Sequence, residues 1–303
     1  MPILSIILIN YNSSAYTVNC VRSIREKVNP ALEYEIIVVD NNSAPEDVTA
    51  LTAALEKDRG VLLFKSHFNA GFGGGNMMGV QLARGEFLAF VNNDSLLRND
   101  CFSIIIDAMR ENPEFGICGP KAFKEDGTLL PTLDHFTSLA KTFLGRSVLE
   151  KLNPKKYPNR KKNYEKPQRA QFVAGSFMVV RAADFLAAGG FDTNIFLYHE
   201  ETDLCRRLAK VGKYAYLVPE AEFVHYHGGS TPRSVAIKTE LKLSQLYVIR
   251  KHEGFWAYQI VLNYFRIRYA FVSLFRAKYR SLFGVLLRGA HLSESLRVKG
   301  KGR

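Results

Sequence analysis

Cysteine is scarce in this sequence. The 303 residues include four cysteines, Cys20, Cys101, Cys118 and Cys205, and no two of them form a Cys-x-x-Cys pair. Cysteines this far apart argue against a structural zinc site or a disulfide framework. They fit the reducing environment of the cytoplasm.

Long hydrophobic runs are also missing. No stretch of about 18 uninterrupted apolar residues occurs, which argues against a membrane-spanning helix. The apolar start, MPILSIILIN, lacks the basic leader and long apolar core of a secretory signal. We therefore interpret this start as a buried strand and expect a cytoplasmic protein.

Acidic residues are outnumbered, and the excess of positive charge is uneven. The chain has 41 lysines and arginines against 29 acidic residues, a net charge of +12. Residues 146–169 hold nine basic residues against two glutamates, and residues 255–303 hold ten against one. Without a recognisable nucleic-acid reading element, this pattern favours an anionic membrane surface over nucleic acid. Plain solubilising charge is the alternative.

The first half of the chain alternates apolar runs with helical patterns. This alternation predicts an α/β fold with a mainly parallel sheet and helices on both sides. The predicted strands are residues 4–9, 34–40, 61–65 and 86–94, followed in the second half by a strand broken at Gly175 (170–181) and by a strand and loop (214–230). The predicted helices are residues 15–28, 46–58, 75–84, 100–112 and 201–211, with helix from about 233 onward. Residues 146–169, rich in proline, lysine and arginine, are predicted to be a mobile loop.

Polar residues follow three of the predicted strands. They are residues 10–12 (Asn-Tyr-Asn), 40–42 (Asp-Asn-Asn) and 92–94 (Asn-Asn-Asp). Parallel α/β sheets bind ligands at the carboxyl ends of their strands. Asp94 could hold a divalent cation against a diphosphate, and His225 could add a nitrogen ligand. A turn cap at Asp94 and a core hydrogen bond at His225 are the plainer alternatives.

The position of a glycine cluster argues against a second class of protein, the dinucleotide-binding dehydrogenases. A dinucleotide-binding dehydrogenase needs a Gly-x-Gly-x-x-Gly turn directly after its first strand, but that turn here reads INYNSSAY. The glycines lie instead in HFNAGFGGGNMMG (67–79), after the third strand. There they would let the backbone approach a flat ligand, with Asn76 opening a helix, or they would form a flexible turn.

The stretch FLYHEETDLCRRL (196–208) places Glu200, Glu201 and Asp203 in four positions. At helical spacing Asp203 pairs with Arg207, and Glu200 lies near that side. Glu201 shares a side with Leu204 and Leu208, so its carboxylate can point inward. A helix with an acidic first turn is the alternative interpretation.

Taken in order, several segments resemble the inverting glycosyltransferases of family 2, with the GT-A fold, and especially the bacterial rhamnosyltransferase-like branch. They are SIILINYN, IIVVDNNS, NAGFGGGN, FVNNDS, VAGSFMVVR, GGFDTNIFLYHEETDLCRRL and VHYHGGS, spanning residues 4–230. The resemblance implies a GT-A domain over residues 1–232. Residues 233–303 would then be a helical, basic and aromatic C-terminal extension.

The resemblance also implies roles for individual residues. The implied nucleotide- and donor-binding residues are Tyr11, Asn12, Asp40, Asn69, Gly71, Gly74, Asn76, Asn92, Asn93 and Asp94. Gly175 and Ser176, with Glu200 and Asp203, match the loop that faces donor sugar and acceptor. Asp94 matches the last position of the family's DxD motif and would bind Mg²⁺ or Mn²⁺ with His225, although Asn92 replaces the first aspartate.

Glu201 matches the catalytic base of the family. A carboxylate there would take the proton of the acceptor hydroxyl, and the transfer would invert the sugar's configuration. Neighbouring acids would raise the pKa of Glu201, whereas the helix N-terminus would lower it, and the sequence leaves the balance open.

The implied reaction moves one sugar to a lipid-linked or surface-polysaccharide acceptor at the inner face of a bacterial plasma membrane. The donor expected from the resemblance is dTDP-rhamnose, with a UDP-hexose as alternative. A non-catalytic, membrane-bound nucleotide-sugar-binding protein is the alternative from another class. The aromatic and basic segment 254–289 suits an interfacial helix pair, internal packing or the seam of a homodimer.

Overall fold

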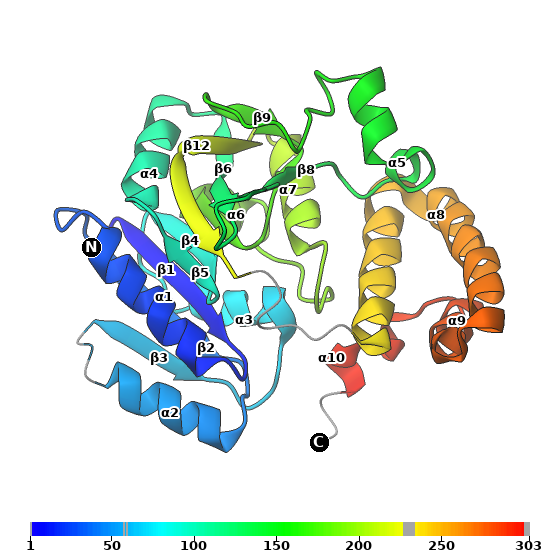
Figure 1. Ribbon diagram of the computed structural model, residues 1–303, viewed down its shortest axis with the longest axis horizontal. Coiled ribbons are helices and arrows are strands. Elements are labelled where there is room, and N and C mark those ends of the chain that lie inside the picture. The colour runs from blue at the N-terminus through cyan, green and yellow to red at the C-terminus, as the bar shows by residue number, and fades with distance from the viewer. Residues whose placement is uncertain (1, 57, 59, 227–233, 300–303) are drawn as a thin grey trace.

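The computed structural model of this chain describes residues 2–56, 58, 60–226 and 234–299, and is built around a ten-stranded sheet (Figure 1). The strands are β1 (Leu4–Asn10), β2 (Tyr34–Asp40), β3 (Val61–Lys65), β4 (Phe87–Asn92), β5 (Ser95–Leu97), β6 (Phe115–Phe123), β7 (Leu129–Leu130), β8 (Leu133–Asp134), β9 (Gln168–Ala170), β10 (Phe172–Val173), β11 (Phe177–Arg181) and β12 (Tyr214–His225).

The helices alternate with the strands in the first half and dominate the C-terminal part. They are α1 (Ser14–Lys27), α2 (Pro45–Leu55), α3 (Gly71–Val80), α4 (Cys101–Glu111), α5 (Leu139–Leu152), α6 (Ala182–Ala187), α7 (Glu200–Lys210), α8 (Val235–Phe275), α9 (Arg280–Leu287) and α10 (Leu296–Lys299). Two 3₁₀ turns, Ala277–Tyr279 and Leu292–Glu294, connect the last helices.

The main sheet runs in the order β3-β2-β1-β4-β11-β6-β12-β5. Its first four strands are parallel, β11 is antiparallel to both neighbours, and β6 and β12 are again parallel. A separate two-stranded sheet pairs β8 with β10. The predicted α/β architecture with a mainly parallel core of the sheet is confirmed, and antiparallel β11 brings the segment after Gly175 beside β4. The short strands β5, β7 and β9 are also antiparallel to their neighbours.

Two apolar clusters cover the two faces of the sheet. Helices α1, α2 and α4 pack on one face, against strand residues such as Ile6 and Val38. Helices α3, α6 and α7 pack on the other, where Ile7 and Phe90 are fully buried. Alternate residues of β1 therefore serve opposite clusters, as expected for a strand covered on both sides.

Two predicted boundaries are wrong. Helix α3 begins at Gly71 rather than at Asn76, so the glycine cluster forms its first turns. The basic segment 146–169 is not a loop throughout, because α5 extends to Leu152.

The C-terminal helices form their own apolar cluster, in which Val261 and Phe265 of α8 pack against Leu282 and Leu286 of α9. Helix α8 is interrupted at Gly254, whose φ of 87° and ψ of −178° are not helical. Its two halves are residues 235–253 and 255–275. Within the described residues, no helix combines the length and apolarity needed to cross a membrane.

Candidate active site

Side-chain hydrogen bonds join the carboxyl ends of β1, β2 and β4. The Asn10 amide Nδ2 donates to Asp40 Oδ1 at 2.9 Å and to Asp47 Oδ2 at 2.8 Å. Thr17 Oγ1 donates to Asn10 Oδ1, and Asn93 Nδ2 donates to Thr17 Oγ1, each at 2.8 Å. The three polar strand ends therefore meet at one edge of the sheet, and buried Asn10 and Asp40 hold it in shape.

The loops next to this network carry the other predicted nucleotide-binding residues. Asn12 has a positive φ of 51°, its backbone N–H donates to Ser43 Oγ, and its Oδ1 accepts from the Ala44 N–H at 2.7 Å. This pairing fixes the β1–α1 loop against the β2–α2 loop. Tyr11 is 44% exposed, so its ring is accessible to a flat ligand at this edge.

A second pair of amides fixes the start of α3. Asn41 Nδ2 donates to Asn69 Oδ1 at 3.0 Å and to the Gly71 carbonyl at 3.1 Å. The Gly71 N–H in turn donates to Asn69 Oδ1. The sequence did not lead us to predict a role for Asn41. Its position directly after Asp40, at the carboxyl end of a predicted strand, could have indicated one.

The glycines of α3 bring the other site segments together. A Cβ at Gly71 would lie 2.0 Å from the Phe196 carbonyl oxygen, and one at Gly73 would lie 3.5 Å from Glu200 Cγ. Phe72 approaches Gly175. The close contacts at Gly71 exclude a side chain there. Gly71 and Gly73 therefore allow α3 to pack closely against the segment that leads into α7. Gly74 packs on Ala70, and the Asn76 side chain is buried and donates to the Phe72 carbonyl.

Asp94 lies against the end of β12. His225 Nε2 is 3.1 Å from Asp94 Oδ1, and the Asp94 side chain is nearly fully buried. Asn93 and Asp94 line a pocket of about 130 Å³ with Tyr16 and Tyr226. The Asn92 N–H donates to the Ser176 carbonyl at 2.8 Å, so the predicted donor and acceptor loop lies beside this strand end.

A carboxylate oxygen and an imidazole nitrogen at this distance fit one side of a divalent cation, with diphosphate oxygens on the other. The described residues contain no group of three or more histidine, cysteine, aspartate or glutamate side chains placed to hold a metal. Among the described residues, Asp94 and His225 are therefore the two candidate ligands here. His227 and Gly228–Ser230, part of the histidine motif, lie outside the described residues.

Glu200 and Glu201 form the first turn of α7. Glu200 is 2% exposed, its Oε1 has no hydrogen-bond partner among the described residues, and burial together with the charge of Glu201 raises its pKa well above the usual range. Glu201 is partly buried, and burial raises its pKa to about 6. The pKa of Glu201 is therefore raised by burial, a cause that the sequence-based comparison of neighbouring acids with the helix N-terminus did not include.

Strained backbone precedes this turn. Tyr198 and His199 both have positive φ, at 71° and 73°. His199 Nδ1 is 2.9 Å from Thr137 Oγ1, and burial lowers the pKa of His199 to about 3, so the ring is neutral. Two consecutive left-handed residues other than glycine cost free energy and persist where packing over-determines them, as at functional sites.

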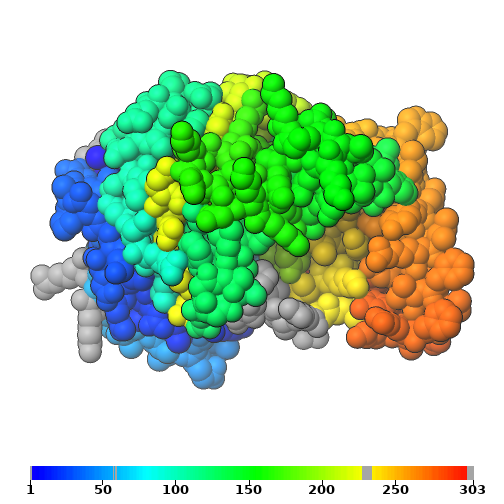
Figure 2. Space-filling view, turned by 45° about the horizontal axis from the view of Figure 1, so that its top comes forward, coloured from blue at the N-terminus to red at the C-terminus, as the bar shows by residue number. Residues whose placement is uncertain are grey.

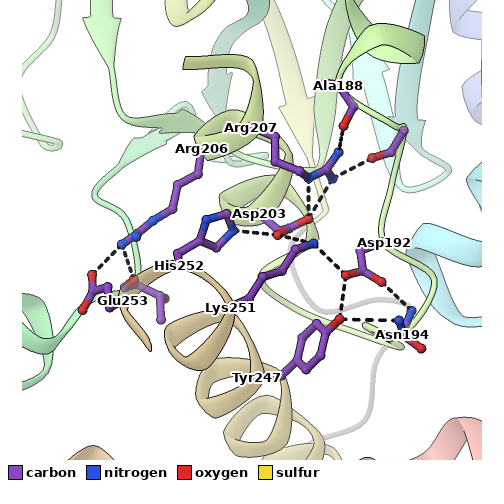
Figure 3. A network of polar contacts seen from close by, with 12 residues as sticks. Ala188, Asp192, Asn194, Asp203, Arg206, Arg207, Tyr247, Lys251, His252 and Glu253 are labelled. Atoms are coloured by element: carbon purple, nitrogen blue, oxygen red, sulfur yellow. Dashed lines mark hydrogen bonds and ion pairs between the residues drawn. The ribbon is translucent and has the colours of Figure 1, made fainter. Parts of the chain in front are cut away.

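Asp203 lies on the other side of α7 and is fully buried among cations (Figure 3). Arg207 donates to Asp203 Oδ2 from Nε and Nη2 at 2.9 and 2.7 Å, which confirms the predicted pair. Two residues of α8 also reach Asp203 Oδ1: His252 Nε2 at 2.7 Å and Lys251 Nζ at 2.8 Å. The His252 hydrogen bond and the nearby cations hold the pKa of Asp203 far below its usual range, despite burial.

Helix α8 also holds the segment before α7. The Tyr247 hydroxyl and Lys251 Nζ both donate to Asp192 Oδ2, at 2.8 and 2.7 Å. Ser244 Oγ donates to the Leu197 carbonyl at 2.9 Å. The first half of α8 therefore fixes α7 and the strained turn that leads into it.

The predicted site residues at the sheet edge, in α3, in the 175–176 loop and at Glu200 lie around one region. Glu201, the predicted base, follows Glu200 in α7, and the charged groups that act on it are Lys141 of α5 and Asp134 of β8. Asp203 is turned toward α8, where its contacts are structural, and the sequence interpretation missed Lys251 and His252 as its partners. The larger cavity, of about 550 Å³, lies elsewhere, between the start of α5, the outer side of α7 and the interruption of α8.

Comparison with solved structures defines the class of protein. A crystal structure of GalNAc-T7 with UDP, GalNAc and Mn²⁺ matches 95% of this chain and 56% of that chain, with a TM-score of 0.62 at 14% identity. The mannosyltransferase PcManGT from Pyrobaculum calidifontis, in complex with GDP-Man and Mn²⁺, matches 97% of this chain and 87% of that one, with a TM-score of 0.56 at 15% identity. The fold is that of the GT-A glycosyltransferases.

Sequence comparison then gives the family. The model of Glycosyl transferase family 2 matches residues 5–186, more than half of the chain. The chain belongs to this family and is a glycosyltransferase. It is 27% identical over 264 residues to the rhamnosyltransferase WbbL of Escherichia coli K12, covering 81% of this chain and 92% of WbbL.

A second relative is the N-acetylglucosaminyl-diphospho-decaprenol L-rhamnosyltransferase of Mycobacterium tuberculosis (strain CDC 1551 / Oshkosh). It is 31% identical over 158 residues, which are 50% of this chain. The match spans about half the length (51%) of that relative.

The contacts of Asp203 predict a large stability loss on Asp203→Asn. Removing its charge leaves the partly buried Arg207 guanidinium without its counter-ion and leaves Lys251 paired with Asp192 alone, so we expect the free energy of unfolding to fall by about 3 kcal/mol. Denaturant unfolding at neutral pH measures this loss. The control is Asp58→Asn, which breaks the more exposed pair with Arg25 and should cost less than about 1 kcal/mol.

The difference between wild type and Asp203→Asn should also depend on pH. Because the pKa of Asp203 is depressed in the folded state, its stabilisation is complete above the unfolded pKa, about 4, and is lost as pH falls further. Equal unfolding free energies for wild type and variant at neutral pH would contradict the role of this network.

Proposed function

We propose that this glycosyltransferase transfers a sugar from a nucleoside diphosphate donor with inversion, and that Glu201 is the general base. The single observation that carries this proposal is the state of Glu201: partly buried, in the first turn of a helix that an ion-pair network fixes, with a pKa raised to about 6. A carboxylate with that pKa is largely ionised at neutral pH and is still a competent proton acceptor.

In the proposed step, the acceptor hydroxyl oxygen forms a bond to the anomeric carbon while the bond from that carbon to the diphosphate oxygen breaks. The hydroxyl proton goes to a Glu201 carboxylate oxygen, and the nucleoside diphosphate leaves with the bonding electron pair. Attack from the side opposite the leaving group inverts the anomeric configuration.

The network at the carboxyl ends of β1 and β2 supports a nucleotide site. We infer that Tyr11, Asn12 and Asp40 hold the base and ribose, with Asn69 and the start of α3 beside them. The preferred donor is dTDP-rhamnose, which the two rhamnosyltransferase relatives support. A UDP-hexose is the alternative, supported by the UDP in the GalNAc-T7 structure.

Asp94 and His225 would hold a divalent cation, as their 3.1 Å separation allows. When bound, the cation supplies positive charge that offsets the charge of the departing diphosphate. Mg²⁺ takes almost only oxygen ligands, so the imidazole favours Mn²⁺, the ion present in both solved neighbours described above.

We infer that the acceptor is a lipid-linked glycan and that the enzyme works as a peripheral protein at the inner face of the plasma membrane. The diphospho-decaprenol in the name of the mycobacterial relative supports a lipid-linked acceptor. In this proposal, residues 1–232 form the catalytic domain and residues 233–303 a helical extension.

Glu201→Gln tests the assignment of the base. The amide cannot accept the proton, so we expect the transfer rate to fall by about 10² to 10⁴ while donor affinity stays within a few-fold. Radiolabelled sugar transfer and donor titration measure the two effects. The control is Glu165→Gln, at an exposed glutamate of the loop after α5, which should transfer at the wild-type rate. Equally slow turnover in wild type and Glu201→Gln would instead support a non-catalytic nucleotide-sugar-binding protein.

The pKa of Glu201 predicts the pH dependence of transfer. The reactive form is the carboxylate, so the rate should increase about tenfold per pH unit below pH 6 and level off above it. A pH profile of the single-turnover rate at saturating donor measures this limb. A rate independent of pH between 5 and 8, with chemistry limiting, would contradict Glu201 as the base.

A panel of nucleotide sugars identifies the donor. We expect dTDP-rhamnose to raise the melting temperature more than UDP-glucose or GDP-mannose, because a ligand at 100 times its Kd stabilises the folded state by about 2.7 kcal/mol. The increase should require Mn²⁺ and should be lost in Asp94→Asn. A larger shift with a UDP-hexose would replace the rhamnose assignment, and equal shifts without metal would refute the metal site.

A further inference from the structure

The second half of α8 and the neighbouring helix α5 carry large apolar side chains on the protein surface. On α8, Trp256 is 77% exposed and Phe275 is 86% exposed. We call the whole set the apolar face: Phe143, Leu144, Val148 and Leu152 of α5, with Phe255, Trp256, Ile260, Ile267, Phe271, Leu274 and Phe275 of α8.

Four of the α8 side chains gather on one side of that helix. Ile260, Ile267, Phe271 and Leu274 follow one another at steps of seven, four and three, which places them along one stripe of α8. The Phe143 ring lies 5.1 Å from that of Tyr264, between the first two members of the stripe, and so brings α5 alongside. Figure 2 shows α5 (green) next to this part of α8 (orange) on one flank of the molecule.

The charge of the same segment has one sign. No aspartate or glutamate occurs between Glu253 and Glu294, whereas six basic residues do. They are Arg266, Arg268, Arg276, Lys278, Arg280 and Arg288. Forty residues without an acid, in which aromatic and basic side chains alternate, complement an anionic surface that has an apolar interior.

The apolar face begins beside a cavity that α7, the helix carrying Glu201, also lines. The cavity of about 550 Å³ is lined by Leu139 at the start of α5, by Arg206 and Lys210 of α7, and by Glu253 just before the interruption of α8. One turn beyond Leu139 and two residues beyond Glu253, the exposed residues Phe143 and Phe255 begin the apolar face. Its two helices therefore start at the walls of a cavity that α7 also lines.

We propose that the apolar face is the surface by which this enzyme lies on an anionic phospholipid bilayer, with its aromatic side chains at the level of the lipid headgroups. This inference rests on the proposed lipid-linked acceptor, because it explains how a chain whose described helices cannot span a membrane reaches one. The occupant is the bilayer surface rather than a second copy, since the continuous positive charge of the segment would repel an identical face.

Vesicle flotation tests the proposal without donor or acceptor. Wild type should float with vesicles of phosphatidylcholine and phosphatidylglycerol, bind at least tenfold more weakly to pure phosphatidylcholine, and lose binding in high salt. Ile267→Ser/Phe271→Ser should reduce binding to the anionic vesicles at least tenfold. The matched control is Leu186→Ser/Val211→Ser, which alters two equally exposed apolar residues outside the face (62% and 58%, against 62% and 64%) and should float as wild type does.

Two outcomes would overturn the proposal. One is equal flotation of the two double variants. The other is a wild-type dimer by light scattering that Ile267→Ser/Phe271→Ser converts to monomer without changing flotation, because the face would then be a subunit interface. Thermal unfolding checks that both variants fold. Sugar transfer to a water-soluble acceptor glycan, without detergent, distinguishes failure of the docking proposal from failure of the proposed reaction. Lost flotation with retained transfer in Ile267→Ser/Phe271→Ser supports the docking face. Flotation of the wild type without any transfer refutes only the proposed reaction.

Discussion

The buried carboxylate of Asp203 is the constraint on which the rest of the site depends. A charge removed from water must be matched by nearby opposite charge, and Asp203 finds Arg207 on its own helix and Lys251 and His252 on α8. These partners can be satisfied together only if α7 and α8 keep one relative position. Because Glu200 and Glu201 begin α7, that position also determines where the proposed base points.

Helix α7 carries two carboxylates in its first turn whose environments shift their pKa in opposite directions. Asp203 is surrounded by cations, and its pKa is lowered. Among the described residues, Glu201 has only the charge of Lys141 as a favourable partner, and burial raises its pKa to about 6. An isolated helix N-terminus would have favoured the charged form of Glu201. The pKa of the structural carboxylate is thus shifted away from neutral pH, and that of the proposed base toward it.

The sequence predicted the elements whose patterns are local. The continuous apolar runs at Tyr34–Asp40 and Val61–Lys65 are strands with the predicted bounds. The first is buried from Ile36 to Asp40, whereas the second, at the edge of the sheet, leaves Leu62 and Phe64 exposed. The central strand Phe115–Phe123 was missed, since Gly116, Gly119 and Pro120 interrupt its apolar run. The Asp203–Arg207 pair was predictable from helical spacing. The contacts of Asp203 with Lys251 and His252, 48 and 49 residues further along the chain, depend on tertiary packing that no local pattern encodes.

Gly254 explains how one helical segment can serve two surfaces. Before it, residues of α8 make polar contacts with α7 and with the segment leading into it, so that half is fixed by hydrogen bonds and ion pairs. After it, α8 packs on α9 through one side and leaves the other apolar and exposed. A φ of 87° is strained for any residue with a side chain, so the change of direction depends on glycine. The residues on either side of Gly254 show this division directly: Glu253 pairs with Arg206 of α7, whereas Phe255 is exposed.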